Sequence, residues 1–238
     1  MFYIDYTYII LVLPAVLFAM VASMMVNSTF NRYSKQYTRC GLTGYAAARA
    51  VLDAYGLHHV QIECISGNLT DHYDPRTNVI RLSQAVYHST SSAAVGVAAH
   101  EAGHAIQHAE AYLPIKIRSA IIPITNFASR LAMPLILAGI LLTVFGDVFF
   151  YVAVAGVVCF SLSAVFQLVT LPTEFNASRR ALHAIRNETR LSPSEVAGAK
   201  KVLTAAAMTY VAALAVSLAQ LLRLVLLVAR VSGGRRRD

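Results

Sequence analysis

The chain has 238 residues, of which 57% are hydrophobic and 13% are charged, and its formal net charge is +8. A soluble domain of this size carries nearer a quarter of its residues as charges, so the composition excludes an ordinary soluble protein and indicates a polytopic membrane protein with one modest polar domain. The positive charge does not indicate a nucleic-acid partner, because basic loops beside membrane helices explain it more simply.

Four apolar blocks are candidates for membrane spans, which need about 20 residues each. The first, residues 8–26, is uncharged and does not resemble a cleaved signal, because no lysine or arginine precedes it. The second and third, residues 127–145 and 148–171, are separated by a Gly-Asp turn and are predicted to form a transmembrane hairpin. The fourth block runs from about residue 202 to residue 222.

Lysine and arginine gather in two of the loops between these blocks. Residues 27–118 hold eight of them and residues 172–201 hold six, whereas the tip of the hairpin holds none. Positive loops stay in the cytoplasm, so both loops are predicted to be cytoplasmic, with the amino terminus and the hairpin tip outside. The basic tail, residues 233–238, conflicts with this pattern if the fourth block crosses the membrane; the alternative is that the block turns back along the cytoplasmic surface. Three scattered cysteines favour a reducing compartment.

The first basic loop contains signals for short regular elements. A helix is expected from Thr43 to Tyr55, closed by Gly56. The stretches "VQIECI" and "NVIRLS" interleave β-branched and polar residues and flank a run of turn formers, which predicts a β-hairpin. The next stretch, "SSAAVGVAAHEAGHAIQHAEAY", is typical of a helix made of small residues. Late in the chain, "LSPSEVAGAKKVL" opens a helix with a Ser-x-x-Glu capping box.

The segment "VAAHEAGHAIQHAE" places His100, Glu101 and His104 within one helical turn. Residues four apart share a helix face, about 5 to 6 Å apart at Cβ, so the two imidazoles can bind one metal ion. Glu101, at the edge of that face, can reach a water on the metal without being a ligand. This is the His-Glu-x-x-His arrangement of zinc peptidases. The alternative, a helix with two surface histidines and a glutamate, does not explain the small residues around them.

A catalytic zinc needs a third protein ligand and an open fourth position. Glu174 is the best candidate, because it is a lone acid in "LPTEFNASRRAL", where the chain leaves the third apolar block, and the hairpin would return it to the side of the histidines. His108 is about 12 Å from His100 along the helix axis, too far to share the ion. The alternative for Glu174 is an interfacial acid paired with Arg179 or Arg180, and the third ligand would then be one of the other histidines: His58, His59, His72, His88 or His183.

The segments "HEAGHAIQHAE", "LTDHYDPRTNVIRLS" and "LPTEFNASRRAL", in this order, resemble the YugP-like family of bacterial membrane neutral zinc metallopeptidases over nearly the whole chain. In more distant outline the chain is similar to HtpX-type and CAAX prenyl proteases. The resemblance implies a gluzincin-like site with one catalytic Zn²⁺ on His100, His104 and Glu174, and Glu101 as the general base. The distant relatives tend to carry Glu-x-x-x-Asp, whereas Ser178 stands here; a hydroxyl can hold an imidazole N–H but adds no charge.

The strand expected at "NVIRLS" directly precedes the metal helix. In zinc peptidases an edge strand in this place pairs with the extended substrate through backbone hydrogen bonds. Substrate binding is therefore predicted for Asn78, Val79, Ile80 and Arg81, and an ordinary sheet strand is the alternative. The neighbouring "TDHYDP" is interpreted as a turn rather than as a second metal site.

Together these features predict a mostly α-helical membrane protein with about four transmembrane helices and a small cytoplasmic α+β, zincin-like metallopeptidase domain. The expected segments are an N-terminal transmembrane helix (1–26), the metallopeptidase domain (27–118), a transmembrane hairpin (119–171), a cytoplasmic segment with the third zinc ligand (172–201), and a C-terminal membrane helix with its basic tail (202–238).

The predicted function is a multi-pass cell-membrane zinc endopeptidase that cuts membrane-associated proteins at the cytoplasmic face. Its partners would be a protein or peptide substrate and the lipid bilayer, with no nucleic acid; the need for a partner subunit in the membrane stays open. The alternative is a non-catalytic adaptor with a metal-stabilised fold, although a pure scaffold has no need of Glu101. A transporter is disfavoured, because few polar residues lie inside the apolar blocks.

Overall fold

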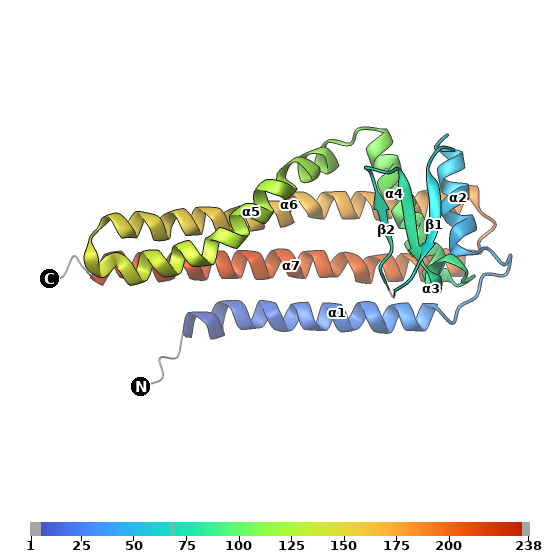
Figure 1. Ribbon diagram of the computed structural model, residues 1–238. Helices are drawn as coiled ribbons and strands as arrows, with labels where there is room; N and C mark the ends of the chain where they lie inside the picture. Colours follow the sequence, from blue (N-terminus) through green and yellow to red (C-terminus); the bar gives the residue numbers. More distant parts are fainter. Residues whose placement is uncertain (1–5, 68, 235–238) are drawn as a thin grey trace. The chain divides into compact units, whose positions relative to one another are not determined.

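The computed structural model describes residues 6–67 and 69–234, so the last residues of the basic tail lie outside the described part. The described chain is mostly helical, with one small sheet (Figure 1). In chain order the elements are a π-helical turn (Tyr8–Val12), α1 (Leu13–Tyr33), α2 (Gly44–Ala54), β1 (Gln61–Ile65), β2 (His72–Asp74), β3 (Val79–Ser83), α3 (Gln84–Tyr87), α4 (Ser92–Ala109), α5 (Leu113–Leu142), a 3₁₀ turn (Thr143–Phe145), α6 (Val148–Glu188) and α7 (Pro193–Gly234).

Four of the described helical segments are long and apolar enough to cross a membrane. They are Tyr8–Tyr33, Leu113–Phe145, Val148–Glu188 and Pro193–Arg230. Each contains one of the four apolar blocks predicted from the sequence, but each helix continues beyond its block. The helix α6 has 41 residues, whereas about 20 residues cross a bilayer. Roughly half of α6 can therefore carry polar side chains outside the hydrocarbon.

The chain divides into two compact units, and the first is built from apolar helix segments. It comprises Met1–Val21, Ile117–Leu171 and Tyr210–Asp238. Within it α5 and α6 approach closely through small residues: a Cβ added to Gly139 would lie 2.3 Å from the backbone nitrogen of Ala153, and one added to Gly156 would lie 2.8 Å from the carbonyl oxygen of Ala132. Close approach through small residues is how membrane helices pack against each other.

The second unit contains the sheet and comprises Ala22–Lys116 and Pro172–Thr209. Its three-stranded sheet has the order β1-β3-β2, and α4 contacts α2, α3, β2 and β3. Large apolar side chains from several elements fill the core, among them Leu52 of α2, Ile80 and Leu82 of β3, Ile106 of α4 and Ile185 of α6. Six of the seven alanines of α4 are buried among them, so most of this helix runs through the interior of the unit.

The helix α2 begins and ends where the sequence predicts. The side-chain oxygen of Thr43 caps its N-terminus by accepting the N–H of Ala46 at 3.1 Å. Gly56 follows its last turn with φ of +69°, a left-handed conformation that glycine adopts without strain. The guanidinium of Arg49 then holds the chain that leads to β1, because it donates to the carbonyl oxygens of Leu57 and Val60 at 2.9 and 2.8 Å.

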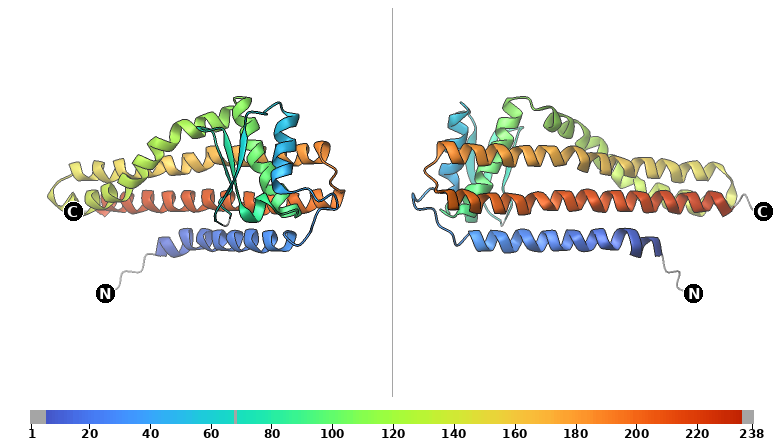
Figure 2. Two further views of the ribbon diagram at one scale, coloured as in Figure 1. Left: turned by 45° about the vertical axis from the view of Figure 1, so that its right-hand side comes forward. Right: turned by 180° about the vertical axis from the view of Figure 1, so that it is seen from behind.

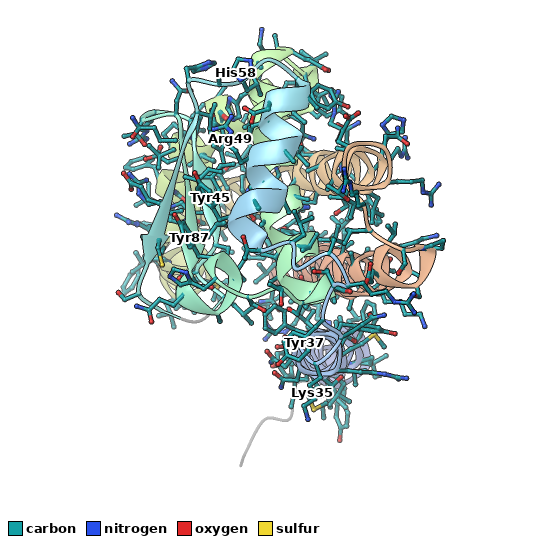
Figure 3. The ribbon with its side chains drawn as sticks, turned by 90° about the vertical axis from the view of Figure 1, so that its right-hand side faces the viewer. Lys35, Tyr37, Tyr45, Arg49, His58 and Tyr87 are labelled. Atoms are coloured by element: carbon teal, nitrogen blue, oxygen red, sulfur yellow. The ribbon has the colours of Figure 1, made fainter. Side chains whose placement is uncertain are left out.

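Aromatic contacts join α2 to the short helix α3. The ring of Tyr45 on α2 lies 5.0 Å from the ring of Tyr87 on α3, measured between centroids. Figure 3 shows these two side chains next to each other, with Arg49 further along the same helix. The contact holds α3 against α2. The segment after α3 leads into the N-terminal cap of α4.

The sheet corrects the predicted hairpin between "VQIECI" and "NVIRLS". Strands β1 and β3 are parallel neighbours, and the hairpin is formed by β2 and β3. The prediction was wrong because the intervening turn formers contain a strand of their own, and its hairpin turn is held by Asp74. This carboxylate accepts the N–H of Arg76 and the hydroxyl of Thr77, each at 3.0 Å. The Arg76 N–H and the Arg81 guanidinium lower the pKa of Asp74 to about 2.

The sheet also corrects the predicted substrate strand. The residues Asn78, Val79, Ile80 and Arg81 were expected to form a free edge, but β3 is the central strand. Val79 and Ile80 are paired with β1 on one side and with β2 on the other. Backbone groups that already bond two neighbouring strands cannot take up a third, so the expected free edge at Val79, Ile80 and Arg81 is wrong. The two edge strands are β1 and β2, and β2 is the edge that contacts α4.

The capping box predicted at the start of α7 is present. The side-chain carboxylate of Glu195 accepts the N–H of Ser192 at 2.7 Å, and the hydroxyl of Ser192 accepts the N–H of Glu195 at 3.4 Å. The second oxygen of Glu195 accepts the N–H of Arg39 at 2.7 Å. The box therefore starts α7 and also fixes the segment that follows α1 against it.

Candidate metal centre

The helix α4 places His100 and His104 on one face. It is capped by Ser91, whose hydroxyl accepts the N–H of Ala94 at 3.2 Å. The two imidazole rings lie 4.7 Å apart between centroids and are nearly perpendicular to each other. Their side chains are 15% and 12% exposed, so they are accessible at the surface of an otherwise buried helix.

The helix α6 brings Glu174 to the same point. Its carboxylate is 2% exposed, and its Oε2 lies 3.2 Å from Nε2 of His100 and 3.5 Å from Nε2 of His104. One ligand atom from each of the three residues falls within 4.8 Å of the others. Tetrahedral Zn²⁺ with bonds of about 2.05 Å needs ligand atoms roughly 3.3 Å apart, so this donor set fits the ion. Among the described residues, it is the one group of three with metal-ligand spacing.

The two helices that carry these candidate ligands approach each other at Gly103. A Cβ added there would lie 2.6 Å from the carbonyl oxygen of Ala177 on α6, which is closer than real Cβ contacts. Gly103 directly precedes the second histidine, and Ala177 lies three residues after Glu174. The absence of a side chain at Gly103 thus allows α6 to lie near enough to α4 for the three ligands to meet.

We expect Gly103→Ala to separate α4 from α6 and weaken zinc binding, with a loss of about 1 to 3 kcal/mol in stability from overpacking. Gly96→Ala is a matched control, since it adds the same methyl group to the same helix where the nearest atom of Ala199 is 3.1 Å away. The measurement is zinc content and thermal unfolding of both variants. Equal zinc retention in the two variants would contradict this role of Gly103.

Neighbouring side chains orient the two imidazoles. With Nε2 of each ring directed at the metal position, Nδ1–H of His100 donates to the hydroxyl of Ser178 at 3.1 Å, and Nδ1–H of His104 donates to Oε1 of Gln107 at 3.0 Å. Gln107 is fully buried, and its amide N–H groups donate to the carbonyl oxygen of Thr173 and to Oδ1 of Asn176. Such partners fix the orientation of metal-binding histidines.

Glu101, the general base expected from the sequence, points toward the edge of the sheet. It is 8% exposed, and its Oε2 accepts the backbone N–H of Tyr73 at 3.0 Å. Tyr73 is the middle residue of β2. Its N–H is used by Glu101 and not by β3, so the backbone groups of Tyr73 lie on the free edge of the sheet, facing the metal helix.

The electrostatic environment of His104 favours its protonated form. Burial alone would lower the pKa of His104, but the hydrogen bond to Glu174 and the charges of Glu101 and Glu174 outweigh it, so the pKa lies above its ordinary value. In the metal-free protein, a proton on Nε2 of His104 must therefore leave before this nitrogen can bind a metal ion.

Four other residues that the sequence suggested as partners of the site have different contacts in the structure. Arg180 does not pair with Glu174; it forms an ion pair with Glu110 at 2.7 Å and donates to Asn176 at 2.7 Å. The ring of His108 packs 5.6 Å from that of Tyr73. Asp71 and Asp74, weighed as a second metal site, bond instead to β3 and to the hairpin turn.

Sequence reasoning missed Gln107 and Tyr73. The position three residues after His104 was a signal for Gln107, because it shares the helix face of the histidine. For Tyr73 no local signal existed, since its role depends on the order of strands in the sheet.

Comparisons with known proteins find a family and a relative that each match nearly the whole chain. Residues 8–229 match the family model described as "Putative neutral zinc metallopeptidase". The chain is 45% identical over 220 residues, 92% of its own length and 96% of the relative, to "Putative membrane protease YugP" of Bacillus subtilis (strain 168). No solved structure matches it.

Proposed function

This chain belongs to the neutral zinc metallopeptidase family, and from that premise we propose that it cuts membrane-associated proteins with one zinc ion held by His100, His104 and Glu174. The family and the relative make it a zinc metallopeptidase of the membrane. The observation that carries the ligand assignment is the meeting of three ligand atoms from α4 and α6 within 4.8 Å. The orientation of both imidazoles by Ser178 and Gln107 supports it.

Glu101 is proposed as the general base. Bound zinc supplies a water with a pKa near 7 and polarises the scissile carbonyl. With zinc bound, Glu101 would serve as the group that takes a proton from the attacking water and gives it to the leaving amine. Its burial beside the metal position supports this role, and the N–H of Tyr73 holds its carboxylate in place.

The edge strand β2 is proposed as the site where an extended substrate pairs. The carbonyl oxygen of Tyr73 points to the same side as its N–H, toward the metal helix, and can accept an N–H of the substrate backbone. A cavity of about 220 Å³ lies beside it, lined by residues that include Tyr73, Asn78 and His108. It can receive one substrate side chain while the backbone lies along β2.

The cytoplasmic face is proposed as the side of cleavage. The ligands lie in two chain segments, 27–118 and 172–201, and both carry the positive charges that keep loops in the cytoplasm. An even number of crossings between α4 and α6 would return Glu174 to the side of the histidines, and α5 and α6 supply two apolar stretches between them.

A chelator experiment on the purified full chain tests the metal dependence. In detergent we expect cleavage of an unstructured, membrane-tethered protein to stop when 1,10-phenanthroline removes the metal, and to return when one equivalent of Zn²⁺ is added back. The measurement is the appearance of new peptide termini by mass spectrometry. Absence of cleavage before and after metal is restored would favour the adaptor instead, and cleavage that survives complete metal removal would exclude the proposed mechanism.

A further inference from the structure

A cavity of about 430 Å³ lies between α6 and α7, within the second unit. Figures 1 and 2 show these portions of the two helices side by side. The lining combines apolar and basic side chains, with no acidic residue among them: Phe175, Ser178, Arg179, Leu182, His183, Arg186, Lys200, Leu203, Thr204 and Ala207. We call this cavity the α6–α7 groove. A second cavity, of about 510 Å³, adjoins it and shares Leu182, Arg186 and Lys200.

The basic side chains are not spread evenly along the groove, since two of the three arginine and lysine residues lie at one end. The chain reverses between α6 and α7, so Arg186 and Lys200, which are nearest to the reversal, occupy one end, and Phe175 and Ala207 occupy the other. This second end is next in sequence to the uncharged blocks: Phe175 comes four residues after Leu171, about 6 Å along the helix axis. The groove thus has Phe175 at the end that is next in sequence to the uncharged blocks, Arg179 one turn further along α6, and Arg186 with Lys200 at the opposite end.

The cations of the groove have no acidic partner among the residues that the structure describes. Within the described part of the chain, Arg179, Arg186 and Lys200 form no ion pair with an acidic side chain. On the other side of α7, by contrast, Arg32 and Lys201 lie 5.7 and 5.9 Å from the ring of Tyr33. Arg32 and Lys201 also line a cavity, of about 520 Å³, but there they contact the Tyr33 ring. Among the described residues, Arg179 and Arg186 of the α6–α7 groove have no such ring contact, so an anionic ligand would supply their missing partner.

We propose that the α6–α7 groove binds an acidic phospholipid, with the phosphate between Arg186 and Lys200 and an acyl chain along Phe175 and Leu203. Arginine and lysine beside a membrane helix recognise phosphate headgroups, and a guanidinium matches phosphate oxygens in geometry. A free phosphate would explain the basic side chains of the groove but not its apolar ones. The proposal rests on the membrane location of the protein and not on its peptidase mechanism.

The test measures binding of a headgroup-labelled phosphatidylglycerol to the full-length, zinc-loaded protein in neutral detergent micelles. The double variant Arg186→Gln/Lys200→Gln should weaken binding by about 25-fold, from about fivefold for each charge removed next to an acidic headgroup. The control Arg76→Gln/Arg190→Gln removes the same charge from exposed side chains outside the described cavities, and should change binding less than about twofold. Labelled phosphatidylcholine should bind both variants and the wild type equally.

Three results would overturn the proposal. Equal weakening by the two double variants would mean that general surface charge attracts the lipid. Displacement by inorganic phosphate at the same concentration as phosphatidylglycerol would make the groove a free-phosphate site. Unchanged lipid binding in the folded double variant would show that Arg186 and Lys200 do not bind the phosphate. Zinc content and thermal unfolding monitor the fold, and the single variant Arg186→Gln, with an expected fivefold loss, replaces the double variant if that one does not fold.

Discussion

Glu101→Gln is expected to retain zinc and to lower kcat/KM for peptide hydrolysis by at least about 100-fold, the lower end of what a positioned general base contributes. The amide has almost the shape of the carboxylate, and its oxygen can still accept the N–H of Tyr73. The position of β2 and the metal ligands should therefore be unchanged. What is lost is a group that can take a proton from the attacking water. Zinc content by elemental analysis and cleavage of a fluorogenic peptide measure the two properties separately.

Glu63→Gln is the matched control, because it makes the same chemical change on β1, where the side chain is 50% exposed and pairs with Arg81. It should retain both zinc and activity. Turnover at the wild-type rate in a zinc-loaded Glu101→Gln protein would exclude Glu101 as the base. Loss of zinc in that variant would show instead that the carboxylate helps to hold the ion.

Local sequence patterns predicted the helices well because their causes are local. The capping residues Thr43 and Ser192 and the left-handed Gly56 act within a few positions of themselves, so both boundaries of α2 and the start of α7 followed from short segments. The same is true of His100 and His104, whose common face depends only on helix geometry. The apolar blocks identified the membrane helices, but not where those helices end, since a helix that leaves the lipid continues as long as its residues favour it.

Strand pairing was not predictable in the same way. The residues of β1 and β3 read as strands, yet whether they pair as a hairpin or in parallel depends on β2, a strand of three residues within a run of turn formers. Which strand is the edge then follows from the pairing, and with it the backbone that faces Glu101. Distant contacts such as that between Gly103 and Ala177 are likewise a property of how α4 and α6 cross.

Glu174→Gln is expected to reduce zinc affinity by more than about 100-fold, because removing a partner of a ligand alone costs about 10- to 100-fold. The carboxylate lies almost fully buried between two imidazoles, and an amide oxygen there cannot provide the negative charge that it gives to the ion. Loss of the ion should also remove a stabilising ligand. At a zinc concentration of 100 times Kd that ligand contributes about 2.7 kcal/mol to the free energy of unfolding.

Thermal unfolding with and without chelator measures this loss without any substrate. The wild type should unfold at a lower temperature after chelation, whereas Glu174→Gln should unfold at the same temperature with and without chelator. Glu188→Gln, an exposed change on the same helix, should behave like the wild type. If Glu174→Gln kept its zinc and its response to chelator, the third ligand would lie elsewhere. The close approach of α4 and α6 at Gly103 would then need an explanation that does not involve the metal.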